Sequence, residues 1–326
     1  MNGLHLYNAL GGNDQAVTDT PGQTAQHPFK MLISFHYYKN VDLASFLDQF
    51  PSRPMVFGDS GAYSAYSQGA EVKVADYAAW LKTWGDLLTT YVNLDVIRDP
   101  SGTAANQRHL ENAGLRPIPV FHTGTDMKVL RDLIKHYGYI ALGGMVGVPG
   151  PHALKWCATC FKEARGNDVV YHGFGQTRND VIQQLPWFSV DSSSWGAGHR
   201  FGQIPVWDRR KLAKVKVGDR TNIYKVARHI RDLGGDPEWF ADRNQYHRSK
   251  AITVSAASWR EFELFLRRKH GEVPLPDRAH AFHRRNTPGT DTRMPGPNVY
   301  LAEGSGDNLR IAAQAVHKQA NRGGPT

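Results

Sequence analysis

Residues 169–193 read VVYHGFGQTRNDVIQQLPWFSVDSS, and this stretch contains the pattern that decides the fold. Two short apolar runs, VVYHGFG (169–175) and FSVDSS (188–193), stand on either side of RNDVIQQLP (178–186), which is typical of a short helix. Parallel strands need a crossover connection, which is usually helical. The stretch therefore predicts a strand–helix–strand unit.

Similar units recur along the chain. Further candidate strands are MLISFHY (31–37), PMVFGD (54–59), YVNLDVI (91–97), PIPVFH (117–122), YIALGG (139–144) and, more weakly, AITVS (251–255). Amphipathic helical patterns lie between them, for example at 72–89 and 126–138. Buried strands that alternate with helices indicate an α/β fold with a parallel sheet. Seven or eight units favour a (β/α)8 barrel of the TIM type, since neither a G-x-G-x-x-G fingerprint nor a P-loop follows any strand.

The composition excludes several classes of protein. Eight Trp, 13 Tyr and 14 Phe among 326 residues are too many for a largely disordered chain. No apolar run approaches the roughly 20 residues of a membrane-spanning helix. The first residues show neither a basic segment nor an apolar core of a signal peptide, so we expect a cytoplasmic protein, in the host cytoplasm if a phage encodes it.

The two cysteines, Cys157 and Cys160, are too few for a disulfide scaffold and suggest a reducing compartment. Their C-x-x-C spacing invites a redox or zinc interpretation, but a structural zinc needs four ligands and the chain has no second C-x-x-C. The segment HALKWCATCFKEA (152–164) reads as an amphipathic helix. We therefore expect two small residues on that helix, and no metal site.

Positive charge gathers in the last part of the chain. The net charge is +9, and residues 201–326 alone hold 23 Lys and Arg against 13 Asp and Glu. We expect a barrel over residues 1–260, with its catalytic motifs in 54–195, and a basic extension over 261–326 that is partly loop around 288–297. Basic residues interleaved with aromatics suit a nucleic acid, although a solvated basic face is the alternative. The candidate contacts are Arg209, Arg210, Lys211 and Lys214.

Carboxylates stand where three predicted strands end. They are Asp59, Asp95 and Asp191. In a barrel of this kind the carboxyl ends of the strands form the active-site mouth, where His122 and the Gly143–Gly144 pair would also lie. A turn-capping role is the alternative for Asp59 and for Asp191, which lies in a Ser-rich stretch, whereas Asp95 lies in an apolar run, where an unpartnered carboxylate is costly.

Three converging carboxylates suit glycosyl transfer to a base. One attacks the sugar carbon, and a second protonates the leaving group and later activates the incoming one. A third can accept both N–H groups of a guanine edge. Glycines would let backbone amides approach a flat base closely.

Four segments together resemble the tRNA-guanine transglycosylases. FGDSGAYSAYSQG (57–69) is similar to their D-S-G-G-F-Q region, and YVNLDVI (91–97) to the strand with their base-reading aspartate. YIALGGMVGV (139–148) resembles G-G-L-A-V-G, and YHGFGQTRNDVIQQLPWFSVD (171–191) the stretch that ends at the nucleophilic aspartate. The four occur in the family's order and spacing.

The resemblance implies a (β/α)8 barrel and guanine exchange through a covalent aspartyl–sugar intermediate, which makes the protein a glycosyltransferase of the pentosyltransferase class. It implies that Asp191 is the nucleophile, Asp59 the general acid and base, and Asp95 the reader of the base edge. The implied substrate contacts also include Ser60, Gly61, His122, Gly143, Gly144 and Met145. No metal or other cofactor is implied.

Departures from the family pattern favour its DNA branch. Residues 192–326 hold no cysteine, so the family's zinc subdomain is absent, and Ala62 stands in place of the second glycine. The chain is similar to the phage and bacterial DNA 7-deazaguanine transglycosylases, whose co-substrate is a free base such as 7-cyano-7-deazaguanine. A tRNA-guanine transglycosylase, a base-removing hydrolase and a catalytically silent nucleic-acid-binding barrel stay open as alternatives, as does a helper protein that opens the duplex.

Overall fold

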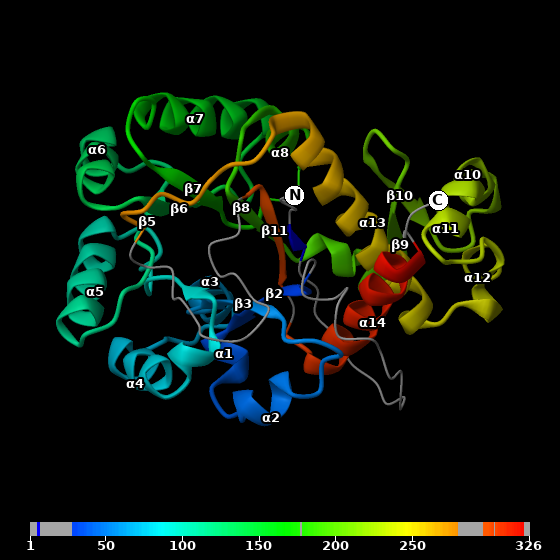
Figure 1. Cartoon of the computed structure of the whole chain (residues 1–326), viewed down its shortest axis with the longest axis horizontal. Coiled ribbons are helices and arrows are strands. Elements are labelled where there is room, and N and C mark those ends of the chain that lie inside the picture. The colour runs from blue at the N-terminus through cyan, green and yellow to red at the C-terminus, as the bar shows by residue number, and fades with distance from the viewer. Residues whose placement is uncertain (1–4, 7–27, 177, 280–295, 303, 323–326) are drawn as a thin grey trace.

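The computed structural model describes residues 5–6, 28–176, 178–279, 296–302 and 304–322. Within these residues, eight parallel strands form one curled sheet in the order β4-β3-β2-β11-β8-β7-β6-β5, and the short β1 pairs with β11 (Figure 1). The strands are β1 (His5–Leu6), β2 (Lys30–Ser34), β3 (Met55–Asp59), β4 (Thr90–Tyr91), β5 (Val120–His122), β6 (Tyr139–Gly143), β7 (Val170–Gly173), β8 (Ser189–Ser192) and β11 (Asn298–Ala302). The sheet is consistent with a TIM-like α/β fold.

Helices follow the strands in the predicted alternation. They are α1 (Phe35–Tyr38), α2 (Leu43–Leu47), α3 (Ala62–Ser67), α4 (Val74–Trp84), α5 (Pro100–Asn112), α6 (Met127–His136), α7 (Gly150–Glu163) and α8 (Asn179–Gln184). Figure 1 shows α4 to α7 in an arc around the strands. The expected helix around Cys157 and Cys160 is confirmed as α7, and both thiols are free and buried. No helix of the described residues is long and apolar enough to cross a membrane.

The two ends of this strand order approach one another at one point. Val92, directly after β4, forms a parallel bridge with Ile118, which precedes β5. The Asn93 N–H donates to the Ile118 carbonyl, and the Ile118 N–H donates to the Tyr91 carbonyl, each at 2.9 Å. This isolated bridge lies just after β4 and just before β5.

The weakest of the expected strands is wrong. Residues 251–255 lie in helix α13 (Arg248–His270), and the eighth strand is β11. The first half of α13 is rich in small and apolar residues and is buried on most sides, between the sheet and a second hydrophobic core. A helix buried all round lacks the polar stripe that identifies a surface helix, so its pattern resembles a short buried strand.

A long insertion separates β8 from β11. It contains η2 (Ser194–Gly196), α9 (Ala197–Phe201), the antiparallel hairpin of β9 (Gln203–Trp207) and β10 (Leu212–Lys216), α10 (Arg220–Lys225), α11 (Ala227–Asp232), α12 (Glu238–Ala241), η3 (Arg243–Gln245) and α13. Figure 1 shows α10 to α12 grouped at one end of the molecule, beyond α13 and α14 (Gly306–Arg322).

The expected division at residue 260 falls inside α13. Beyond it, β11 pairs with both β2 and β8, so the segment after residue 260 supplies part of the sheet. Most of the expected loop, residues 288–295, lies outside the described residues.

A buried ion pair ties α13 to the start of the sheet. Lys30 Nζ of β2 lies 3.2 Å from Glu263 Oε1 of α13, and both side chains are almost fully buried. The Val299 N–H of β11 donates to Glu263 Oε2 at 3.4 Å. Burial raises the pKa of Glu263 to about 7, against the opposing effect of Lys30, Arg267 and Arg260. Glu263 is therefore a buried carboxylate that faces Lys30, Arg260 and Arg267 together.

Removal of the Glu263 charge should destabilise the protein more than removal of the Lys30 charge. In Glu263→Gln the three cations lose the buried counter-charge that they share, and we expect a loss of about 3–5 kcal/mol in the free energy of unfolding. In Lys30→Met the loss should be smaller, because Arg260 and Arg267 still face Glu263. Urea unfolding measures both, with the exposed Asp132→Asn as a control that should change stability by less than about 1 kcal/mol. Equal losses in the two variants would contradict this account.

Candidate functional site

The carboxylates predicted at strand ends lie at one edge of the sheet. Asp59 is the last residue of β3, Asp191 is the third residue of β8, and Asp95 follows β4 by four residues. All these strands are parallel, so their carboxyl ends share that edge. Burial raises the pKa of Asp59 to about 7, and the negative charges of Asp95 and Asp191 add to the rise. The structure thus brings the three groups into electrostatic contact.

Asp59 has little to offset this repulsion. Its Oδ2 accepts a hydrogen bond from the Gly61 N–H at 3.0 Å, and the hydrogen bonds from Gly61 and Ser60 lower the pKa by less than the other effects raise it. Gly61 has a φ of +73°, and a Cβ there would lie 2.5 Å from Cβ of His36. The Ser60–Gly61 turn therefore needs its glycine to aim an N–H at the carboxylate.

Asp191 is held through one oxygen. The Gly175 N–H donates to Asp191 Oδ1 at 2.7 Å, and His172 Nε2 lies 3.4 Å from the same atom. Gly175 belongs to the turn after β7 and has a φ of +57°, a conformation that favours glycine. Both of these contacts go to the same carboxylate oxygen, Oδ1.

His172 is a site residue that the sequence reasoning missed. It is fully buried on β7, where its ring stacks on Phe57 with 4.4 Å between centroids. Its Nδ1 lies 2.7 Å from Ser189 Oγ, and that hydroxyl also hydrogen-bonds the Tyr139 hydroxyl. Burial lowers the pKa of His172, against the opposing effect of Asp191. The one sequence signal was a histidine inside the otherwise apolar run VVYHGFG.

Asp95 and His122 form a pair across neighbouring segments. His122 Nε2, at the end of β5, lies 2.9 Å from Asp95 Oδ2, and each side chain is 15% exposed. Gly143 of β6 lies against the imidazole, since a Cβ there would be 2.6 Å from His122 Cδ2. The pair is thus packed on one side and reaches solvent on the other.

The residues after β6 form a tight turn beside this pair. Gly144 has a φ of +77°, and its carbonyl accepts a hydrogen bond from Thr123 Oγ1 at 2.8 Å. The Met145 side chain is buried, with Cys157 Sγ 3.2 Å and Gln176 Nε2 2.8 Å from its sulfur. Gly143, Gly144 and Met145 therefore place backbone, rather than long side chains, next to His122.

The four predicted nucleic-acid contacts lie elsewhere. Arg209, Arg210 and Lys211 are at the turn of the β9–β10 hairpin, and Lys214 is on β10. The Arg210 carbonyl accepts from Gln183, in the last turn of α8, and the Gln183 carbonyl contacts His270 at the end of α13. Since α8 ends where the chain turns back to begin β8, this tip lies toward the amino ends of the strands. The structure does not bring these four residues to the carboxylates.

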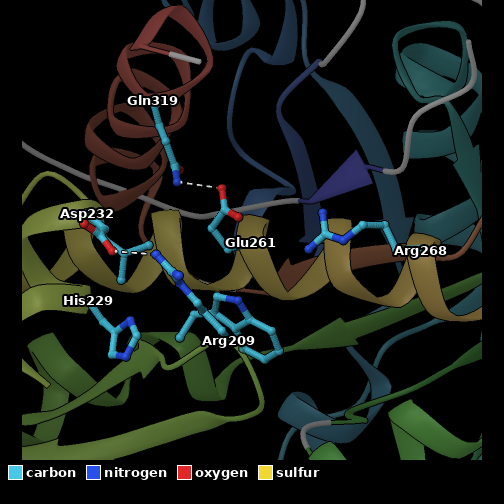
Figure 2. A pocket seen from close by; sticks show the side chains of 8 residues that line it. Arg209, His229, Asp232, Glu261, Arg268 and Gln319 are labelled. Atoms are coloured by element: carbon cyan, nitrogen blue, oxygen red, sulfur yellow. Dashed lines mark hydrogen bonds and ion pairs between the residues drawn. The ribbon is translucent and has the colours of Figure 1, made fainter. Parts of the chain in front are cut away.

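Arg209 instead lines a separate pocket of about 380 Å³, between the hairpin, α11, α13 and α14 (Figure 2). Its guanidinium lies 3.2 Å from Asp232 Oδ2, and Gln319 donates to Glu261 at 2.9 Å. Arg209 faces the Asp232 carboxylate, and Glu261 places a second carboxylate in the pocket, which makes it a poor match for a polyanion.

No known family model and no curated protein matches the chain. Over the described residues, no group of three or more His, Cys, Asp and Glu side chains is arranged to hold a metal ion.

Replacement of Asp59 should stabilise the protein in a pH-dependent way. Because the pKa of Asp59 is raised to about 7, its ionisation costs the folded state stability as the pH rises from about 4 to about 7. Asp59→Asn keeps an acceptor for the Gly61 N–H and removes that cost. The free energy of unfolding should exceed that of the wild type by about 2–4 kcal/mol at pH 8, and the gain should vanish near pH 4.

Chemical denaturation at several pH values measures this difference, with Asp168→Asn as an exposed control. A gain from Asp59→Asn that is the same at pH 4 and pH 8 would show that the carboxyl group does not titrate as described.

Proposed function

We propose that the protein is a transglycosylase that exchanges guanine in DNA for a 7-deazaguanine base. The observation that carries the proposal is the convergence of Asp59, Asp95 and Asp191 at one sheet edge in three different environments. A base-exchange reaction needs three such groups: one to attack, one to move a proton and one to hold the base.

The proposal includes a closed (β/α)8 barrel. The order of neighbouring strands follows their order in the chain from β2 through β8, with β11 between β8 and β2. The bridge between Val92 and Ile118 supports pairing of the β4 and β5 segments, the remaining gap. In such a barrel the carboxyl ends of the strands carry the chemistry.

Asp191 is the nucleophile in this proposal. One of its carboxylate oxygens forms a bond to C1′ of the target deoxyguanosine while the C1′–N9 bond breaks. The electron pair leaves with guanine, which takes a proton from Asp59. The Gly175 N–H and His172 fix Oδ1, so that Oδ2 is the oxygen aimed at the sugar.

Asp59 acts in both half-reactions. After guanine departs, the ionised Asp59 removes the N9 proton of the incoming 7-deazaguanine, whose N9 then forms the bond to C1′. The C1′–O bond to Asp191 breaks and the carboxylate is restored. A pKa of about 7 suits a group that must donate a proton in one step and accept one in the next.

Asp95 and His122 read the base in this proposal. A carboxylate accepts two N–H groups from the guanine edge, and the imidazole at 2.9 Å orients it. The backbone of Gly143 and Gly144 lies next to His122, where a planar base can approach it. In duplex DNA the target nucleotide would have to leave the stack. Tyr63 and Tyr66 on α3, 55% and 57% exposed, offer stacking surfaces beside Asp59.

Guanine release tests the proposal directly. Radiolabelled guanine-containing duplex DNA and unmodified tRNA are each incubated with the protein and 7-cyano-7-deazaguanine. We expect release of guanine from DNA by the wild type and no release by Asp191→Asn, because the amide cannot form the ester to C1′. A covalent adduct between DNA and the wild type, trapped by denaturation, should also be lost in the variant.

Each other outcome points to a different function. Release from tRNA alone would identify a tRNA-guanine transglycosylase. Release without incorporation of the added base would identify a hydrolase. Release from neither substrate would favour a nucleic-acid-binding barrel without catalysis, and release by Asp191→Asn at the wild-type rate would assign the nucleophile elsewhere.

His172 should act through the position of Asp191. In His172→Phe the stack on Phe57 is kept, but the contact with Asp191 Oδ1 is lost. We expect kcat for guanine release to fall about 10- to 100-fold, with KM for the free base nearly unchanged. His172→Gln, which restores an N–H near the position of Nε2, should recover part of kcat. A change in KM with kcat intact would argue for a role in base binding instead.

A further inference from the structure

The insertion leaves the sheet at the edge that carries Asp191. Directly after β8 come η2 and α9, and the Trp195 indole N–H of η2 donates to the Ala302 carbonyl at the end of β11, 3.3 Å away. His199 of α9 contacts Asn308 at the start of α14, 3.0 Å apart, and Arg200 donates to the Ser193 carbonyl, two residues from Asp191. Since α14 begins just beyond the carboxyl end of β11, α9 stands at the rim of the candidate site.

Later segments of the insertion form hydrogen bonds with α9 and with the residue that follows it. The Val217 N–H donates to the Gly202 carbonyl at 2.8 Å, and the Tyr246 hydroxyl donates to the Gly198 carbonyl at 2.8 Å. Arg243 packs beside Gly218, where a Cβ would lie 2.7 Å from its Nε. The end of β10, the residue after η3 and the start of α13 thus contact α9 or the residue after it, and α10 begins four residues after β10 ends.

These segments present cations, several of them over aromatic rings. The Arg200 guanidinium lies 5.7 Å from the ring centroid of Phe201, which is 72% exposed. Arg220 lies 5.8 Å from Tyr224, and Lys250 lies 5.1 Å from Trp239. We define the rim cations as Arg200, Lys216, Arg220, Arg243, Arg248 and Lys250, of which all but the half-buried Lys250 are exposed.

The carboxylates of the same segments are largely engaged in local structure. Asp219 caps α10 through the Asn222 N–H at 3.1 Å, and Asp242 accepts from the Asn244 N–H at 2.9 Å. Glu238 accepts a hydrogen bond from the Tyr224 hydroxyl, and its Oε2 lies 3.9 Å from Arg220 Nη2. Residues 200–250 hold 13 Lys and Arg against six Asp and Glu, so the surface keeps a positive excess.

We propose that the rim cations bind the phosphodiester backbone of the DNA strand whose target nucleotide enters the carboxylate site. This inference rests on the proposed function and adds where the substrate is held. Arginine and lysine beside exposed rings suit a strand that offers phosphates and unstacked bases. The hairpin tip at Arg209–Lys211 lies toward the opposite edge of the sheet, so we do not expect its positive charges to contact this DNA strand.

Two matched triple variants test the placement. The rim variant carries Lys216→Gln, Arg243→Gln and Arg248→Gln, and the hairpin variant carries Arg210→Gln, Lys211→Gln and Lys214→Gln. Each removes three exposed positive charges from the same insertion. Binding of a guanine-containing DNA duplex and of the corresponding single strand is titrated at several salt concentrations on the full chain. Asp191→Asn serves as a reference that binds without chemistry, and circular dichroism checks the fold of every variant.

We expect the rim variant to bind DNA on the order of tenfold or more weakly at moderate salt. Its slope of log affinity against log salt should be shallower by roughly 2–3, while the hairpin variant stays close to the wild type. The placement is overturned if the hairpin variant alone loses binding, or if both triples bind like a wild type that exchanges guanine normally. A wild type that neither binds nor modifies DNA would overturn the proposed function as well. Salt-dependent binding of tRNA but not DNA would overturn the choice of DNA.

Discussion

The pairing of β11 with both β8 and β2 is the constraint on which the rest of the molecule depends. Tyr300 stands opposite Asp191 in one register, and Met31 stands opposite Leu301 in the other. Without this strand, the half of the sheet that carries Asp59 and the half that carries Asp191 share no backbone hydrogen bonds across the β2–β8 gap. The candidate site therefore depends on one five-residue strand, whose Val299 N–H donates to Glu263 of α13 at 3.4 Å.

The three carboxylates differ because the backbone gives each a different neighbour. Asp95 faces an imidazole, Asp191 faces an N–H and a buried histidine, and Asp59 faces two like charges with only the turn of Ser60 and Gly61 to oppose them. Groups of one chemical type thus acquire distinct properties from their surroundings. This division of environments, rather than the number of carboxylates, is what suits the site to a two-step exchange.

Local patterns in the sequence predicted most of the sheet and the edge at which the candidate residues meet. An apolar run that ends in a carboxylate or a glycine pair, as at Asp59 or Gly143, marks a strand end without any tertiary information. The prediction of the eighth strand at 251–255 was wrong, because the first half of α13 is buried on most sides and shows no polar stripe that distinguishes it from a buried strand. His172 was missed because its importance comes from Ser189 and Asp191, which lie across the strand pair. The count of charged residues identified a basic region, but it could not predict toward which edge of the sheet Arg209 and Lys211 lie.

The late position of β11 in the chain also bears on how the protein is made. During synthesis β2 to β8 emerge in order, and each can pair with its neighbour as it appears. The strand that joins the two halves follows Asp191 by more than one hundred residues, most of them in an insertion with a hydrophobic core of its own. Until that strand arrives, β2 and β8 each have an open edge, and open edges are where strands of different chains associate. Because the insertion has a hydrophobic core of its own, it can form before that strand is made, and α13 is then already in place for β11 to pack against.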